Sequence, residues 1–79
     1  MKVLYLYTTV GCHLCEQALD LINPLLIDFS FGLEAVDIAD SDELVEKYGI
    51  RIPVLRRPDI DKELGWPFDQ QQLRAFFSL

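Results

Sequence analysis

The residues that can do chemistry in this chain are Cys12 and Cys15, which are its only cysteines and stand two residues apart. They follow a β-like run from Val3 to Thr9 and precede a helical pattern that starts at Glu16. Two thiols on one helical turn can close a small disulfide ring, and a helix N-terminus stabilises the thiolate that attacks another sulfur. The spacing therefore predicts thiol–disulfide exchange.

Each cysteine has a distinct predicted role. Cys12 is expected at the first position of the helix, where unpaired amides lower the pKa of a thiol, so it is the predicted nucleophile. Cys15 lies one turn deeper and is the predicted resolving thiol, which attacks the Cys12 sulfur in a mixed disulfide. The alternative is half of a metal site, but four-ligand zinc sites usually bring more cysteines or histidines, and the chain offers only His13. We therefore predict no metal site.

His13 and the Ile52-Pro53 pair are candidate contacts for a substrate. An imidazole at His13 would stabilise the Cys12 thiolate, or it would simply point into solvent. Pro53 follows a short predicted helix and begins a strand, where a cis Ile52–Pro53 bond would lay backbone beside the dithiol. An ordinary trans proline is the alternative, because only about 5–6% of X-Pro bonds are cis. Position along the chain leaves both conformations open.

Composition limits the class of protein. The chain has 79 residues, 51% of them hydrophobic, which is enough for one small folded domain over residues 1–79. The net charge of −6 and the lack of a basic stripe argue against nucleic acid. The apolar run after Lys2 is too short for a secretion signal, and no run approaches the roughly 20 residues of a membrane span. We expect a cytoplasmic protein with no membrane partner, where a close cysteine pair is more often catalytic than structural.

Strand and helix patterns alternate around the cysteines. The continuous apolar run Val3–Thr8 predicts a central strand that is buried on both faces. Apolar spacing after Cys12 predicts a helix that extends to Phe29. Pro24 either kinks this helix or ends it near Asn23, and we favour the kink.

The second half of the chain predicts three more strands and two more helices. A capping box from Asp40 to Glu43 opens a short helix that Gly49 ends, and a second box pairs Asp69 with Gln72 at the start of the last helix. The predicted strands are 33–38, 52–56 and 62–66, a turn is predicted at 57–59, and the last helix points Leu73, Phe76 and Phe77 inward. The predicted order is β-α-β-α-β-β-α.

Three stretches of the chain, in order and spacing, resemble the glutaredoxin and thioredoxin superfamily: Thr8–Cys15, Val36–Ile38 and Tyr48–Leu55. Within it, the chain is most similar to the short glutaredoxin-like proteins whose last helix follows a Trp-Pro-Phe-Asp stretch, here residues 66–69. The resemblance covers nearly the whole chain. It implies an α/β minimal thioredoxin fold with a four-stranded mixed sheet flanked by helices. It also implies a cis Pro53, Cys12 as the attacking thiol and Cys15 as its resolver.

The same resemblance points to a difference in the substrate region. Glutathione-using glutaredoxins carry a Gly-Gly pair before the last helix, whereas this chain has Gly65 to Phe68, with bulk where a peptide backbone would approach. Asp69 remains at a helix start, able to pair with an ammonium group, with free amides behind it for a carboxylate. Trp66 and Phe68 would form an apolar rim for a protein substrate, although aromatic residues in a small domain are more often core. The substrate-binding candidates are His13, Ile52, Pro53, Phe68 and Asp69.

Together these residues predict a glutaredoxin-like thiol–disulfide oxidoreductase that cycles Cys12 and Cys15 in electron transfer and cell redox homeostasis. It needs no bound cofactor, and glutathione is a candidate co-substrate. Its expected partners are a disulfide-containing protein or a small thiol, with a reductase as electron donor, and the chain is expected to be a monomer. Two alternatives stay open: a module that binds an iron–sulfur cluster with glutathione ligands, and a non-catalytic binding protein of thioredoxin fold.

Overall fold

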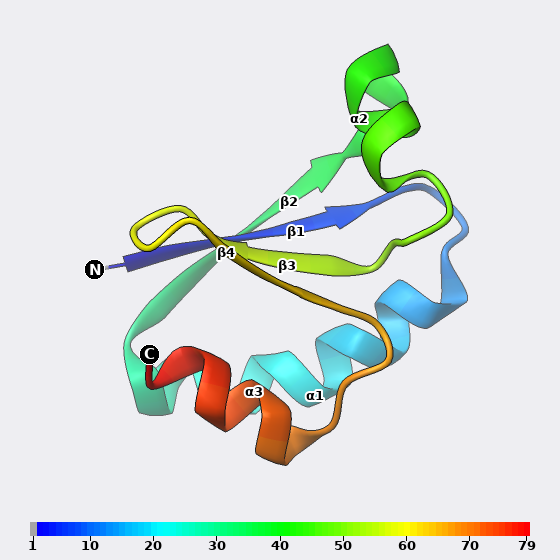
Figure 1. Cartoon of the computed structure of the whole chain (residues 1–79). Coiled ribbons are helices and arrows are strands. Elements are labelled where there is room, and N and C mark those ends of the chain that lie inside the picture. Colours follow the sequence, from blue (N-terminus) through cyan, green and yellow to red (C-terminus); the bar gives the residue numbers. More distant parts are fainter. Residues whose placement is uncertain (1) are drawn as a thin grey trace.

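The fold is that of a computed structural model, which describes residues 2–79. Its helices and strands follow the predicted order, with one added 3₁₀ turn (Figure 1). The elements are β1 (Lys2–Thr8), α1 (His13–Phe29), β2 (Phe31–Asp37), η1 (Ile38–Asp40), α2 (Asp42–Tyr48), β3 (Val54–Arg57), β4 (Lys62–Gly65) and α3 (Gln70–Phe77). None of the helices within 2–79 is long and apolar enough to cross a bilayer.

The four strands form one mixed sheet in the order β2-β1-β3-β4. β1 pairs in parallel with β2 and antiparallel with β3, and β3 pairs antiparallel with β4. β1 is therefore a central strand, as its apolar sequence predicts. This topology and the three α-helices confirm the predicted minimal thioredoxin fold.

The helices cover the two faces of the sheet unequally (Figure 1). α1 and α3 pack on one face, where Leu4 and Leu6 of β1 are fully buried in the main core. Tyr7 points to the opposite face, because side chains alternate along a strand, and it packs with Tyr48 of the shorter α2. Val3 also lies on that face but is 40% exposed. The prediction that β1 is buried on both faces is therefore wrong at its N-terminal end, which α2 does not reach.

The boundaries of α1 and β2 differ from those predicted. α1 continues through Pro24 to Phe29, so the alternative end near Asn23 is wrong. The helix stops at Ser30, whose φ of 59° is left-handed and whose amide bonds back to the last turn. Because this single residue reverses the chain, β2 begins at Phe31, two residues before its predicted start.

The connection from β2 to α2 also differs from the prediction. Ile38 lies in η1 rather than in the strand, because the side chain of Asp37 caps a 3₁₀ turn there. Ser41 caps α2 in place of Asp40, since the Ser41 hydroxyl accepts a hydrogen bond from the Leu44 amide at 3.4 Å. Serine is a preferred N-cap residue, so the cap lies one residue later than predicted. The predicted capping box is wrong, because the third helical residue is then Leu44, whose side chain cannot accept a hydrogen bond.

The turn from β3 to β4 contains a partly buried ion pair. Arg57, the last residue of β3, is fully buried, and its guanidinium donates two hydrogen bonds to the Asp59 carboxylate, at 3.2 and 2.6 Å. These hydrogen bonds hold the pKa of the Asp59 carboxyl below its usual value, and the positive charge of Arg57 acts in the same direction. Arg57 therefore belongs to the strand and the interior, not to the predicted turn.

The lowered pKa of Asp59 predicts a pH dependence of stability. Because this pKa is lower in the folded chain than in the unfolded chain, where it is about 3.9, the ionised carboxylate stabilises the fold above about pH 4. That contribution is lost as the pH falls further. We expect Asp59→Asn to destabilise the protein in urea unfolding at neutral pH and to differ less from the wild type at about pH 3. An equal difference at both pH values would contradict this linkage.

Candidate functional site

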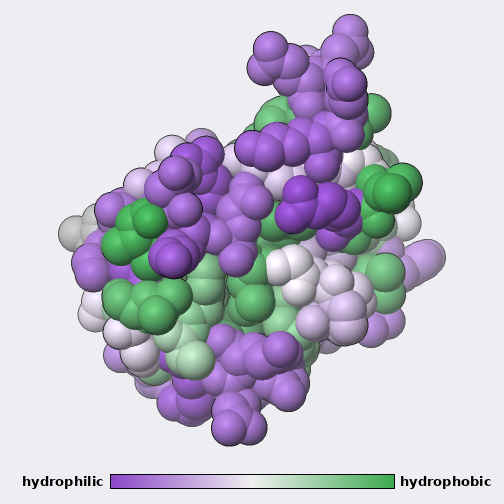
Figure 2. Space-filling model, in the orientation of Figure 1, coloured by the Kyte–Doolittle hydropathy of each residue, from purple (hydrophilic) through white to green (hydrophobic). Residues whose placement is uncertain are grey.

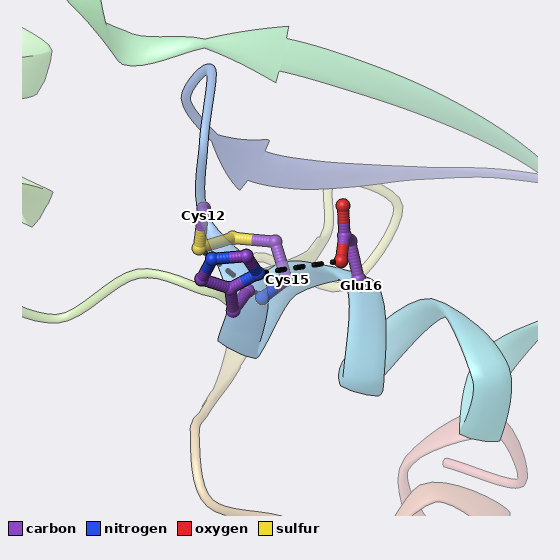
Figure 3. The surroundings of a disulfide bond; sticks show 4 residues. Cys12, Cys15 and Glu16 are labelled. Atoms are coloured by element: carbon purple, nitrogen blue, oxygen red, sulfur yellow. Dashed lines mark hydrogen bonds and ion pairs between the residues drawn. A yellow bond between two sulfur atoms is a disulfide. The ribbon is translucent and has the colours of Figure 1, made fainter.

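Cys12 and Cys15 are joined by a disulfide at the start of α1 (Figure 3). The chain reaches them from β1 through Gly11, whose φ of 79° is in the left-handed region that glycine adopts freely. Cys12 is the N-cap of α1 and not its first helical residue, because its backbone is extended and its sulfur accepts a hydrogen bond from the Cys15 amide at 3.1 Å. The sulfur takes the place that the hydroxyl of a capping serine occupies in other helices.

The two cysteines differ in exposure. Cys12 is half-buried, whereas Cys15 is only 3% exposed. Cys15 is thus the more shielded residue, as its position one turn into the helix predicts. When the disulfide is open, the amides and dipole at the start of α1 favour negative charge on the sulfur of Cys12. The geometry can therefore hold a thiolate at the surface with a second thiol behind it.

His13 lies in solvent beside Glu16. Its side chain is 89% exposed, and its Nδ1 atom lies 3.6 Å from Oε2 of Glu16. Both residues belong to the first turn of α1. Glu16 is absent from the predicted site, although its i,i+3 spacing from His13 is a signal that the two side chains are neighbours on a helix.

The segment that joins α2 to β3 and contains Ile52 and Pro53 lies at the same end of the sheet as the segment that joins β1 to α1 and contains Cys12 (Figure 1). The Ile52–Pro53 peptide bond is cis, Pro53 is buried and Ile52 is half-buried. β3 begins only at Val54, and not at Ile52 as predicted, because the Ile52 amide donates to the Tyr48 carbonyl and Pro53 has no amide hydrogen. Val54 pairs with Tyr7, so the start of β3 lies beside the end of β1, from which the chain continues to the cysteines.

The stretch from Trp66 to Asp69 begins beside the cis Ile52–Pro53 segment. The Trp66 amide donates to the Pro53 carbonyl at 3.1 Å, directly after β4 ends at Gly65, and the Trp66–Pro67 bond is also cis. Phe68 is 5% exposed, lies in the main core and contacts the Trp66 ring edge-on at 5.1 Å. This burial supports the core role for Phe68 and leaves little of its ring for a substrate.

Asp69 caps α3 in the predicted capping box. Its carboxylate accepts a hydrogen bond from the Gln72 amide at 2.8 Å, and the Gln72 side chain accepts one from the Asp69 amide at 2.9 Å. The box itself is confirmed. However, it occupies the amides of Asp69 and Gln72, so the expectation that amides at this helix start are free for a carboxylate is wrong for these two groups.

A cluster of side chains around Tyr48 fixes the position of residues 48–51, which precede Pro53. Tyr48 is 1% exposed, stacks on Tyr7 with ring centroids 4.2 Å apart, and donates its hydroxyl hydrogen to the carboxylate of Glu63. Burial, followed by this hydrogen bond, raises the pKa of Tyr48 above its usual range. The Arg51 guanidinium lies 3.8 Å from Glu63 and 5.5 Å from the centre of the Tyr48 ring. The cluster joins residues from β1, α2 and β4, so no local sequence pattern identifies it.

The surface around the disulfide carries exposed aliphatic side chains. Val10, in the loop before Cys12, and Ile50, in the segment before Pro53, are almost completely exposed, and Leu14 is 44% exposed. The described part of the chain encloses no pocket. Within residues 2–79, no group of three or more His, Cys, Asp or Glu side chains is arranged to hold a metal ion. The disulfide is therefore presented on an open, partly apolar surface.

Comparison with known proteins assigns this arrangement to a family. A family model described as a glutaredoxin-like domain (DUF836) matches residues 3–78. The chain belongs to this glutaredoxin-like family. The resemblance inferred from the sequence is thereby confirmed.

Solved structures similar to the glutaredoxin-like domain span almost its whole length. An X-ray structure of the target protein XcR50 from X. campestris is 42% identical, with 95% of each chain covered and a TM-score of 0.78. A solution NMR structure of protein Ne2328 from Nitrosomonas europaea is 33% identical, with a TM-score of 0.81, and covers 95% of this chain and 89% of that one. The comparison with curated proteins gives no match. The glutaredoxin-like domain thus combines a thioredoxin-like fold with a C-x-x-C pair at a helix start.

Proposed function

We propose that this glutaredoxin-like domain is a thiol–disulfide oxidoreductase whose cysteines cycle between a dithiol and a disulfide. The arrangement at the start of α1 supports this most strongly. The sulfur of the half-buried Cys12 accepts a hydrogen bond from the Cys15 amide, and Cys15 itself is buried. An exposed thiol at a helix N-terminus is the more acidic and reactive one, while a buried thiol is protected from outside molecules. Cys12 therefore attacks, and Cys15 resolves.

The proposed exchange takes place in two balanced steps. The Cys12 thiolate attacks one sulfur of a substrate disulfide, the substrate S–S bond breaks, and the first substrate thiolate leaves and takes up a proton. Cys15 then loses its proton and attacks the Cys12 sulfur of the mixed disulfide. This step releases the second substrate thiol and closes the Cys12–Cys15 bond. The substrate gains the electron pair that the protein loses, and an external thiol or a reductase returns the protein to the dithiol.

Backbone and side chains at this end of the sheet would position the substrate. The cis Ile52–Pro53 segment lies beside the end of β1, and His13 and Asp69 have exposed side chains. The exchange uses sulfur alone and needs no bound cofactor. A small thiol such as glutathione or a disulfide-containing protein of the cytosol is the proposed partner.

A redox titration tests this proposal. The protein is equilibrated in glutathione buffers from reducing to oxidising, free thiols are trapped by alkylation, and the masses of the intact chain are measured. We expect a reversible transition between dithiol and disulfide, with a glutathione adduct accumulating in Cys15→Ser. A transition without an adduct would retain the dithiol activity and point to protein substrates. The lack of any transition across accessible buffers would overturn the proposed function.

A further inference from the structure

Glu16 is the acidic residue in the first turn of the helix that carries the disulfide. Its amide donates to the Cys12 carbonyl at 3.3 Å, and its carboxylate lies 3.6 Å from Nδ1 of His13 (Figure 3). Glu16 directly follows Cys15, and its carboxylate approaches the histidine that stands between the two cysteines, so its negative charge lies close to the disulfide. A charge there acts on any group that approaches the Cys12 sulfur.

The pair formed by His13 and Glu16 has no net positive charge in either state of the imidazole. If His13 is protonated, the Glu16 carboxylate neutralises it at 3.6 Å. If His13 is neutral, Glu16 contributes an uncompensated negative charge. The histidine between the two cysteines therefore does not create a cationic site for an anionic substrate.

The positive charge of Arg51 at this end of the sheet is also neutralised within the chain. Arg51 lies 3.8 Å from Glu63, and the nearby α2, with the sequence DELVEKY, has more acidic than basic residues. Hydrophilic side chains cover most of α2 on the face shown in Figure 2. A surface with net negative charge attracts cationic ligands and repels anionic ones, and salt screens both effects. The three acidic residues of α2 outnumber its one basic residue, Lys47, so a substrate with negative groups next to its disulfide meets net negative charge here.

We propose that Glu16 is a specificity-determining residue of the dithiol, which slows exchange with anionic disulfides relative to cationic ones. This inference rests on the exchange activity proposed above. The favoured substrate class is a disulfide flanked by positive groups, as in a basic polypeptide, and the disfavoured class includes oxidised glutathione, which carries net negative charge at neutral pH. The contribution comes from charge alone, so salt must weaken it.

The test compares two small disulfides of opposite charge, oxidised glutathione and cystamine. Rate constants for oxidation of the reduced protein are measured for the wild type, Glu16→Gln and Asp28→Asn. Asp28→Asn removes the same charge from the exposed last turn of α1, about 18 Å along the helix from Glu16. The ratio of the two rate constants is the readout, because changes in the acidity of Cys12 affect both reactions and cancel. The free dithiol dithiothreitol gives the intrinsic ratio of the two disulfides.

We expect the wild type to favour cystamine more than dithiothreitol does. Glu16→Gln should lower this preference about fourfold at low ionic strength, and the effect should largely disappear at about 1 M salt. Asp28→Asn should leave the ratio unchanged. Equal ratios in the wild type and Glu16→Gln, or equal effects of the two substitutions, would overturn the role of Glu16. If the reduced protein reacts with neither disulfide, the proposed exchange activity itself fails.

Discussion

Cys12→Ser is expected to lose all disulfide reductase activity, while Cys15→Ser completes the first attack and stops at the mixed disulfide. A serine hydroxyl is not ionised at neutral pH, and exchange needs a thiolate, so no other group at the start of α1 replaces the Cys12 sulfur. Cys15→Ser keeps the attacking Cys12 sulfur but lacks the thiol that resolves the adduct. The measurements are the rate of cystamine reduction and the intact mass of each variant after mixing with the disulfide.

Replacing Cys12 by serine is expected to remove the thiol without destabilising α1. Cys12 is the N-cap of α1, and serine is one of the best N-cap residues, so its hydroxyl can accept the hydrogen bond that the sulfur accepts from the Cys15 amide. We therefore expect reduced wild type and Cys12→Ser to unfold at similar temperatures. Wild-type activity in Cys12→Ser, or adduct formation through Cys15 instead, would refute the assignment of the attacking thiol.

The parts of the fold that the sequence predicts are those specified by local patterns. The apolar run of β1, the helical spacing after Cys12 and the capping box of Asp69 and Gln72 each involve residues close in the chain. These patterns correctly predict the element order. Several of the errors concern element ends: at α2 the neighbouring Asp40 and Ser41 are both able to cap, and at the end of α1 the left-handed backbone of Ser30 lets β2 start earlier than predicted.

The parts that the sequence does not predict depend on contacts between distant residues. Tyr48, Glu63 and Arg51 meet because the register of β3 and β4 brings Glu63 under α2, and no spacing along the chain encodes that register. The conformation of the Ile52–Pro53 bond is likewise open from position alone. The same limit applies to Arg57, whose charge and neighbouring proline suggest an exposed turn. Its buried position follows from where α3 ends.

Arg57 joins the end of β3 to the end of α3. Its side chain is fully buried, and its Nη1 atom donates to the carbonyls of Phe76 at 3.0 Å and Leu79 at 2.9 Å. The other side of the guanidinium binds the Asp59 carboxylate, and the group lies 5.0 Å from the centre of the Phe31 ring. Carbonyls at a helix C-terminus lack partners within the helix and attract positive charge. One side chain thus donates hydrogen bonds to the end of α3, pairs with the carboxylate of the β3–β4 turn and packs on a core aromatic ring.

We expect Arg57→Met to lower the free energy of unfolding by about 3 kcal/mol, a large fraction of the roughly 4–12 kcal/mol typical of a domain this size. Methionine fills much of the volume, so the loss comes from the carbonyls of α3, which lose their donor, and from the Asp59 carboxylate, which keeps only the exposed Lys2 ammonium at 3.8 Å. The matched control is Arg56→Met on the same strand. Arg56 is half-buried and pairs with the exposed Asp61, a surface ion pair worth less than about 1 kcal/mol. Urea unfolding of both variants measures the two free energies of unfolding. An equal decrease in both variants would mean that the positive charge on β3, and not the buried contact of Arg57 with α3, stabilises the fold.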